Sequence, residues 1–236
     1  MDPGEYSESM RVLVTIVAAL ALVGSALGAD GEPRKALTKK DQSTARSIVL
    51  KRADLGKGFM AQRRTNDDSV PKGARCDALD ESDLTVTGDA DSPDFRLTNG
   101  PPFVTVASTA QVYRTLREAN ASWNRGTSKQ TARCLADIVR LSAPAGQKIT
   151  VESSKRVPFP DVAPKATAFR LVLTIAINGQ RVRAYVDAVV LQHGRVQSGL
   201  LFTSVGAPVG KSGQVALASL VAERLAKASA PTGPVA

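Results

Sequence analysis

Histidine, cysteine and aromatic residues are scarce in this chain of 236 residues, which holds one histidine, two cysteines and 4% aromatic residues. The single histidine, His193, lies in an expected hairpin turn, so a Ser/His/Asp triad is not expected. Zinc sites built on several histidines are excluded by count. The short acidic pairs Asp67-Asp68 and Asp89/Asp91 have too few ligands for a calcium loop. The sequence therefore predicts no metal, no cofactor and no catalytic residues. A hydrolase that uses Asp187 and a serine without histidine remains the enzymatic alternative.

Long apolar runs are also rare, and the clearest one lies near the start of the chain. It extends from Val12 to Leu27, follows a basic residue and ends in Ala26-Leu27-Gly28. A membrane span needs about 20 apolar residues, whereas a secretory signal has a shorter run followed by small residues. Residues 1–28 are therefore predicted to be a signal peptide, with an uncleaved anchor as the alternative. Because residues 1–9 are acidic, translation could also begin at Met10.

The exported chain is basic. Loss of residues 1–28 removes Arg11 and the three acidic residues Asp2, Glu5 and Glu8, which raises the formal charge from +9 to +11. Outside the cytoplasm such a charge favours anionic lipid, acidic glycan or an exported protein as partner over nucleic acid. The alternative is a solvated basic surface that has no specific partner.

The two cysteines, Cys76 and Cys134, are predicted to form a disulfide, because a lone pair of cysteines in an exported domain is usually oxidised. In the chain-entropy model a closed loop of this size stabilises the fold by about 4 kcal/mol. A disulfide leaves no thiolate for catalysis or for metal binding.

The chain length favours one domain. We expect a polar spacer at residues 29–40, a single domain at 41–228 and a disordered tail at 229–236. Within the domain we expect a short helix before Gly56, strands at 59–60, 84–88 and 103–109, and helices at 112–123, 131–141 and 212–228. Helices and strands do not alternate strictly, which predicts an α+β fold with a largely antiparallel sheet.

The strongest structural signal is a meander between Ala166 and Val205. Asn178-Gly179 and His193-Gly194 are typical two-residue hairpin loops, which would pair Ile177 with Gln180 and Gln192 with Arg195. One face of these strands is then apolar throughout. The other face is basic toward one end and apolar toward the other, and it includes Arg170, Arg181, Arg183, Tyr185, Asp187, Leu191, Val196, Leu200 and Phe202. We expect a second layer of structure to cover it, with a bound ligand as the alternative. The same register places Arg170 opposite Asp187, so a cross-strand ion pair is expected.

A loop between Gly206 and Ser212 is similar to a phosphate-binding loop but does not fit one. Three residues separate Gly206 from Gly210-Lys211-Ser212 where the motif needs four, and Pro208 removes one backbone N–H donor. We interpret the segment as a connection from a strand to a helix that Ser212 caps.

The segment Ala53-Asp54-Leu55-Gly56-x-Gly58-Phe59, together with Arg75-Cys76-Asp77, Ala132-Arg133-Cys134-Leu135, the meander and the closing helix, resembles small exported actinobacterial domains. These are the LpqN-type lipoproteins and the extracellular sensor domains of receptor kinases, which have a PsbP-like α/β/α sandwich. The resemblance covers about residues 41–228. It implies a non-catalytic binding or accessory role and offers no catalytic residues. Phe59 stands where the family often has Trp, and a lipobox cysteine is absent.

The sequence thus predicts a secreted, non-catalytic binding or accessory module of the cell envelope. Its ligand would be amphipathic and anionic, either a lipid or a glycan, and would contact Arg181, Arg183, Tyr185 and Phe202 or the loop 157–164. Membrane contact would be peripheral or through an uncleaved signal. The alternative is a protein that docks through its basic surface and has no small-molecule ligand.

Overall fold

The computed structural model describes residues 31–63, 76, 79–97, 103–141, 148–177 and 180–229. The expected signal peptide, the acidic pair Asp67-Asp68, the turn residues Asn178-Gly179 and the end of the expected tail lie outside these residues.

A nine-stranded sheet forms the centre of the described fold, in the order β1-β3-β5-β9-β8-β7-β6, and β4 pairs with both β2 and β5. The pairings are antiparallel except for β1 with β3. The strands are β1 (Arg34–Lys35), β2 (Phe59–Gln62), β3 (Thr85–Asp91), β4 (Asp94–Leu97), β5 (Val104–Tyr113), β6 (Lys148–Val157), β7 (Lys165–Ile177), β8 (Gln180–His193) and β9 (Val196–Val205). The predicted α+β class is confirmed.

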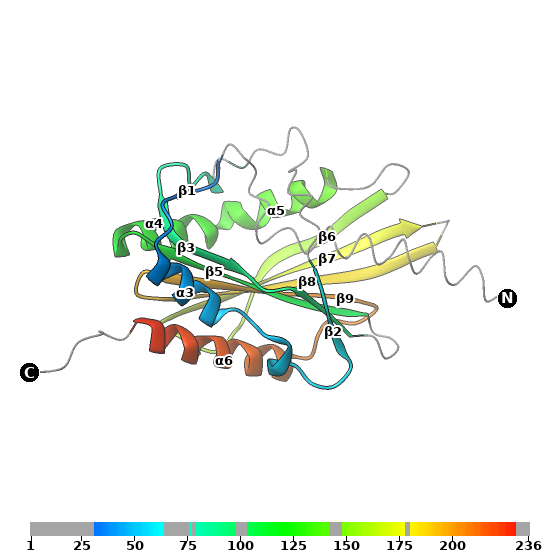
Figure 1. Cartoon of the computed structure of the whole chain (residues 1–236). Helices are drawn as coiled ribbons and strands as arrows, with labels where there is room; N and C mark the ends of the chain where they lie inside the picture. Colours follow the sequence, from blue (N-terminus) through cyan, green and yellow to red (C-terminus); the bar gives the residue numbers. More distant parts are fainter. Residues whose placement is uncertain are drawn as a thin grey trace, which may run out of the picture.

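Helices cover both faces of the sheet, which gives three layers (Figure 1). The helices are α3 (Lys39–Ile48), α4 (Leu116–Gly126), α5 (Lys129–Leu141) and α6 (Lys211–Ser229), with a short 3-10 turn η2 at Arg52–Asp54. Helices α3 and α6 pack on one face in a single hydrophobic cluster. Helix α5 packs on the other face, against Leu171, Leu173 and Leu201. The covering layer expected over Leu191, Val196 and Leu200 is therefore present, because all three pack in the α3/α6 cluster.

The hairpin registers agree with the sequence in one case and differ by one turn position in the other. Ile177 pairs with Gln180, as predicted. At the second hairpin His193 pairs with Val196, so the loop is Gly194-Arg195 and not His193-Gly194. Gly194 has φ +57°, a conformation that glycine adopts without steric cost. The correction moves each pairing by two residues and therefore keeps the same side chains on the same face.

Two ion pairs connect the helices to the rest of the fold. The guanidinium of Arg224 in α6 donates to both carboxylate oxygens of Asp54, at 2.6 and 2.8 Å. Arg195 in the β8–β9 turn donates to both oxygens of Asp41 in α3, at 2.6 and 3.0 Å. Asp54 belongs to the segment that carries the family resemblance, so this part of the motif has a structural role: it fastens the first helical region to the closing helix.

Three sequence expectations need correction. Residues 34–35 already pair with β3 and α3 begins at Lys39, so the expected spacer 29–40 contributes to the fold. Strand β5 continues to Tyr113, so Val112 lies in a strand and the helix begins only at Leu116. Helix α6 begins at Lys211, one residue before the expected cap Ser212. Strands β4 and β6 were not anticipated.

The disulfide between Cys76 and Cys134 is present, as predicted, and joins α5 to the segment before Leu79. Among the helices of the described residues, none has the length and apolarity needed to cross a membrane.

Candidate functional site

The four residues expected to bind a ligand do not form one site. Arg181 and Arg183 are exposed and Tyr185 is half-buried, and all three precede the residues of β8 that pack with α6, Val189 and Leu191. Phe202 shares their face of the sheet but is only 1% exposed, because it packs in the cluster under α3 and α6. Phe202 therefore does not reach the surface on which the two arginines lie.

Arg183 and the neighbouring Arg170 both pair with carboxylates. Arg183 pairs with Glu152 at 3.1 Å, and Glu152 accepts a further hydrogen bond from Thr174. The neighbouring Arg170 donates to both oxygens of the buried Asp187, at 2.6 and 2.9 Å, which confirms the expected cross-strand pair. Gln214 of α6 also donates to Asp187, at 2.7 Å. These contacts give Asp187 a structural role and leave it buried, away from any substrate.

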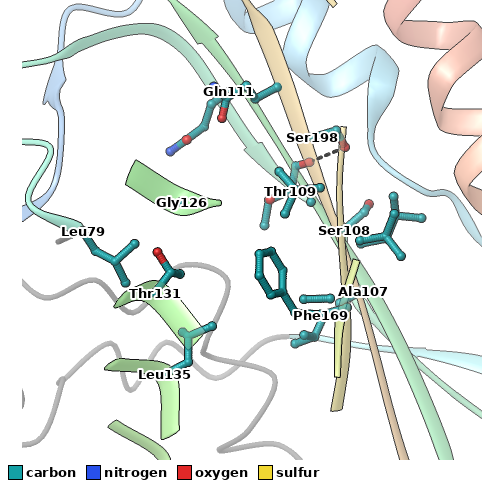
Figure 2. Close-up of a pocket in the computed structure, with 17 residues that line it drawn as sticks. Leu79, Ala107, Ser108, Thr109, Gln111, Gly126, Thr131, Leu135, Phe169 and Ser198 are labelled. Atoms are coloured by element: carbon teal, nitrogen blue, oxygen red, sulfur yellow. Dashed lines mark hydrogen bonds between the residues drawn. The ribbon is translucent and has the colours of Figure 1, made fainter. Parts of the chain in front are cut away.

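A cavity of about 180 Å³ lies on the other face of the sheet, beneath the corner between α4 and α5. Figure 2 shows Leu79, Thr131 and Leu135 on one side of it and Phe169 and Thr109 on the other. An engineered apolar cavity of about 150 Å³ holds one benzene molecule. The space therefore suits an apolar group of about six to eight carbons.

Small residues on three adjacent strands, β5, β9 and β8, leave room for the cavity. In the register of the sheet, Ala107 lies beside Leu201, Leu201 beside Ala188, and Thr109 beside Gly199. A Cβ on Gly199 would lie 3.0 Å from Thr109 Oγ1, so glycine leaves the floor open at its centre. Gly126, the last residue of α4, also lines the cavity, and a Cβ built on it would meet no atom within 4 Å.

The wall of the cavity opposite the sheet is apolar and is fixed by the disulfide. Leu79 and Leu135 both line it. Cys134 directly precedes Leu135, and the backbone N–H of Leu79 donates to the carbonyl of Cys76 at 2.8 Å. The disulfide therefore holds the segment of Leu79 against α5.

A buried polar network closes one end of the cavity. Tyr113 Oη lies 3.0 Å from both Glu81 Oε2 and Gln111 Oε1, and 2.7 Å from Ser122 Oγ. Ser122 also donates to Gln197 Oε1 at 3.3 Å, and Gln197 Nε2 donates to the Ala119 carbonyl at 2.5 Å. Gln111 and Gln197 line the cavity, so one end of an otherwise apolar space is polar and uncharged.

Proton counting in this network favours a neutral Glu81. The Tyr113 hydroxyl has one proton, while both Glu81 and Gln111 present oxygens to it. A protonated Glu81 can donate to Tyr113 and leave the phenol proton for Gln111. Burial raises the pKa of Glu81 above its usual value, although hydrogen bonds from Ser122 and Tyr113 and the charge of Arg125 act in the opposite direction. Burial also raises the pKa of Tyr113 well above its usual value, so the phenol stays protonated.

Two cations lie on the same face of the sheet as the cavity, and Arg156 is the one in contact with a residue of its lining. Arg156 of β6 pairs with Phe169, and its guanidinium lies 5.6 Å from the centre of the Phe169 ring. It also donates to the Thr127 carbonyl at 2.8 Å, next to Gly126. Lys165 of β7 lies 5.6 Å from the centre of the Trp123 ring and donates to Asn120 Oδ1 at 2.6 Å. Arg156 is exposed and forms no ion pair with a carboxylate of the described residues, so its guanidinium can meet an anion beside the cavity.

Sequence reasoning missed this site. Nothing in the sequence singled out Arg156 or Gln111, because β6 was not anticipated and Gln111 directly precedes the helix that was expected from residue 112. The floor residues Ala107 and Leu201 are separated by 94 positions in the chain, and only the pairing of β5 with β9 brings them together. Trp123 of α4 is half-buried, and its ring contacts Lys165.

No group of three or more histidine, cysteine or acidic side chains in the described residues is arranged to hold a metal ion. No protein-family model matches the chain, and no curated protein matches it. Among solved structures it is similar to the extracellular domain of PknH from Mycobacterium tuberculosis. The TM-score is 0.41 and the identity 10%, over 79% of this chain and 96% of that domain. A likeness at this level supports no statement about ligand or activity.

Proposed function

We propose that the protein is a secreted, non-catalytic binding module of the cell envelope that holds a small amphipathic anion. The apolar part of the ligand occupies the cavity between the sheet and the α4–α5 corner, and the anionic group lies at Arg156. The observation that carries the proposal is the position of the Arg156 guanidinium over Phe169, whose ring lines the cavity. The disulfide supports a location in an oxidising compartment outside the cytoplasm.

The dimensions and the chemistry of the site set the ligand class. About six to eight carbons fit the space, and each buried CH₂ contributes about 0.8 kcal/mol. Among the described residues that line the cavity none is charged, so a charged group is favourable only at the border, where Arg156 meets it. A chain of this length with a terminal carboxylate, as at the end of a lipid, satisfies both conditions.

Isothermal titration calorimetry with octanoate, octanol and octylamine tests the proposal. We expect binding of octanoate, weaker binding of octanol and no detectable binding of octylamine. In Arg156→Gln the affinity for octanoate should fall about tenfold, since a hydrogen bond to a charged group contributes about 1.5 kcal/mol or more. The affinity for octanol should stay the same. That second measurement shows whether loss of the Arg156–Thr127 bond has deformed the cavity.

Lys155→Gln is the matched control. It removes the same charge from the adjacent residue of β6, but Lys155 pairs with Arg170 on the opposite face of the sheet. Octanoate should bind this variant as it binds the native protein. If Arg156→Gln and Lys155→Gln weakened octanoate binding equally, only the net charge of the protein would matter. If the native protein did not bind octanoate, the proposal would be refuted.

One observation favours a second function, docking through a basic surface. Lys148, Lys155, Arg181 and Arg183 are exposed around the end of the sheet face that α6 leaves uncovered, with Glu152 as the exposed acidic residue among them. If this surface docks to an anionic polymer, binding should weaken steeply between low and high salt, whereas a chain buried in the cavity should depend on salt only weakly. Replacement of Arg181 and Arg183 by Ser should abolish docking and leave octanoate binding intact.

A further inference from the structure

The cavity contains hydrogen-bonding groups that the fold itself does not use. In the described residues, Gln111 Nε2 and Thr109 Oγ1 have no hydrogen-bond partner, although every other polar side chain of the polar network around Tyr113 is paired. Both residues lie on β5 and line the cavity. In Figure 2 the amide nitrogen of Gln111 points from β5 toward the side of Gly126.

The orientation of Gln111 follows from the network beneath it. Its Oε1 faces the Tyr113 hydroxyl at 3.0 Å, so the amide group presents its nitrogen, a donor, to the cavity. This bond to the Tyr113 hydroxyl therefore places the amide nitrogen, and not the amide oxygen, toward a ligand.

Thr109 provides the second donor. It lies two residues before Gln111 on the same face of the strand, about 7 Å away along the backbone. Its carbonyl accepts from Ser198 at 2.7 Å, but its hydroxyl lies beside Gly199, which has no side chain to occupy the space. The hydroxyl is therefore able to donate into the cavity as well.

Apolar surroundings make this pair of donors selective. An unsatisfied donor costs little while water occupies the cavity, but a plain hydrocarbon displaces that water and leaves the donor without a partner. A ligand with an oxygen at the right depth satisfies the donors and keeps its apolar contacts with Leu135, Phe169 and Leu201.

We propose that Gln111 Nε2 and Thr109 Oγ1 form a subsite that recognises an acceptor oxygen on the buried part of the ligand. The ligand class is then an oxygenated short acyl chain, with a keto or hydroxyl oxygen away from its carboxylate. This inference rests on the proposed function, because it concerns the same cavity. It adds that the interior of the cavity selects among anionic chains of equal length.

Calorimetric titration of the full mature chain with octanoate and 7-oxooctanoate tests the subsite. We expect 7-oxooctanoate to bind at least as tightly as octanoate, although it is the less apolar of the two. In Gln111→Leu the affinity for 7-oxooctanoate relative to that for octanoate should fall about tenfold. Thr109→Val should lower the same ratio by a smaller factor. This second variant keeps the test valid if Gln111→Leu fails to fold, because the Thr109 hydroxyl has no role in the fold.

Three results would overturn the inference. Octanoate could bind with an affinity ratio that neither substitution changes, which would leave the proposed function standing and remove the subsite. 7-Hydroxyoctanoate could bind tightly while 7-oxooctanoate does not, which would mean that the site presents an acceptor and that Gln111 is reversed. If neither octanoate nor 7-oxooctanoate bound, the proposed function would fail together with the subsite.

Discussion

Filling the cavity should stabilise the protein, and Ala188→Leu is the most direct way to do so. Ala188 lies in β8 between Phe169 and Leu201 and lines the cavity, where its side chain is half-buried. Leucine adds three carbons, which contribute about 2.4 kcal/mol at about 0.8 kcal/mol each. Loss of side-chain rotamer freedom offsets about 0.5 to 1 kcal/mol of this. We therefore expect a gain of about 1.5 kcal/mol in the free energy of unfolding, or a Tm higher by about 3 to 6 °C.

Ala184→Leu is the matched control, because Ala184 lies on the same strand and the same face but is fully buried and does not line the cavity. Extra carbons in a closely packed core usually cost about 1 to 3 kcal/mol. Urea unfolding of the two variants measures both changes, and calorimetry should show that Ala188→Leu has lost octanoate binding. If Ala188→Leu destabilised the protein as much as Ala184→Leu, the space beneath α4 and α5 would not be open to a side chain, and the account of the site would be wrong.

The remaining predictions concern the fold around the site. Gly88→Ala should destabilise the protein by about 1 to 3 kcal/mol in urea unfolding, because its Cβ would collide with the carbonyl oxygen of Asp41, whereas Gly56→Ala, with open space around it, should change stability little. A raised pKa of Glu81 in the folded state means that its contribution is present at acid pH and is lost as the pH rises above the usual glutamate value. The stability of Glu81→Gln relative to the native protein should therefore increase from pH 4 to pH 7 in parallel unfolding curves, and a constant difference would contradict a buried neutral carboxyl. Replacing Cys76 and Cys134 together by Ser should cost about 4 kcal/mol of unfolding free energy in the chain-entropy model and weaken octanoate binding, because Leu79 is then no longer held against α5. A double variant that keeps full affinity would show that the disulfide has no role in shaping the cavity.

The sequence predicts the meander of β7, β8 and β9 well because short-range rules determine its register. A two-residue loop fixes the pairing of Ile177 with Gln180, and from that register the ion pair of Arg170 with Asp187 follows. The β8–β9 turn lies one position later than expected, which shifts each strand pairing by two residues. A shift of two leaves every side chain on its predicted face of the sheet, so the assignment of faces was still correct. The α+β class was predictable because it depends on the order of helical and strand patterns along the chain. The disulfide was predictable because the chain has only two cysteines.

The candidate site could not be predicted in this way. Its floor consists of residues whose common feature is small size, and small residues such as Ala107, Ala188 and Gly199 give no signal until the order of the strands is known. The sequence correctly placed Phe202 on one face with Arg181, but the length of α6 decides which part of that face is covered. The periodicity of apolar residues along a strand does not show which of them a helix distant in the chain will bury.

Nuclear magnetic resonance with uniformly ¹³C-labelled octanoate tests the central claim most directly, because it reports which protein methyl groups lie beside the chain. The account predicts nuclear Overhauser contacts from the labelled chain to the methyl groups of Thr131, Leu135 and Leu201, which border the cavity. It also predicts a shift of the Arg156 guanidinium resonance on binding. Contacts to Val172 and Tyr185 instead, on the uncovered end of the opposite face, would contradict it and would place the ligand on the basic sheet surface.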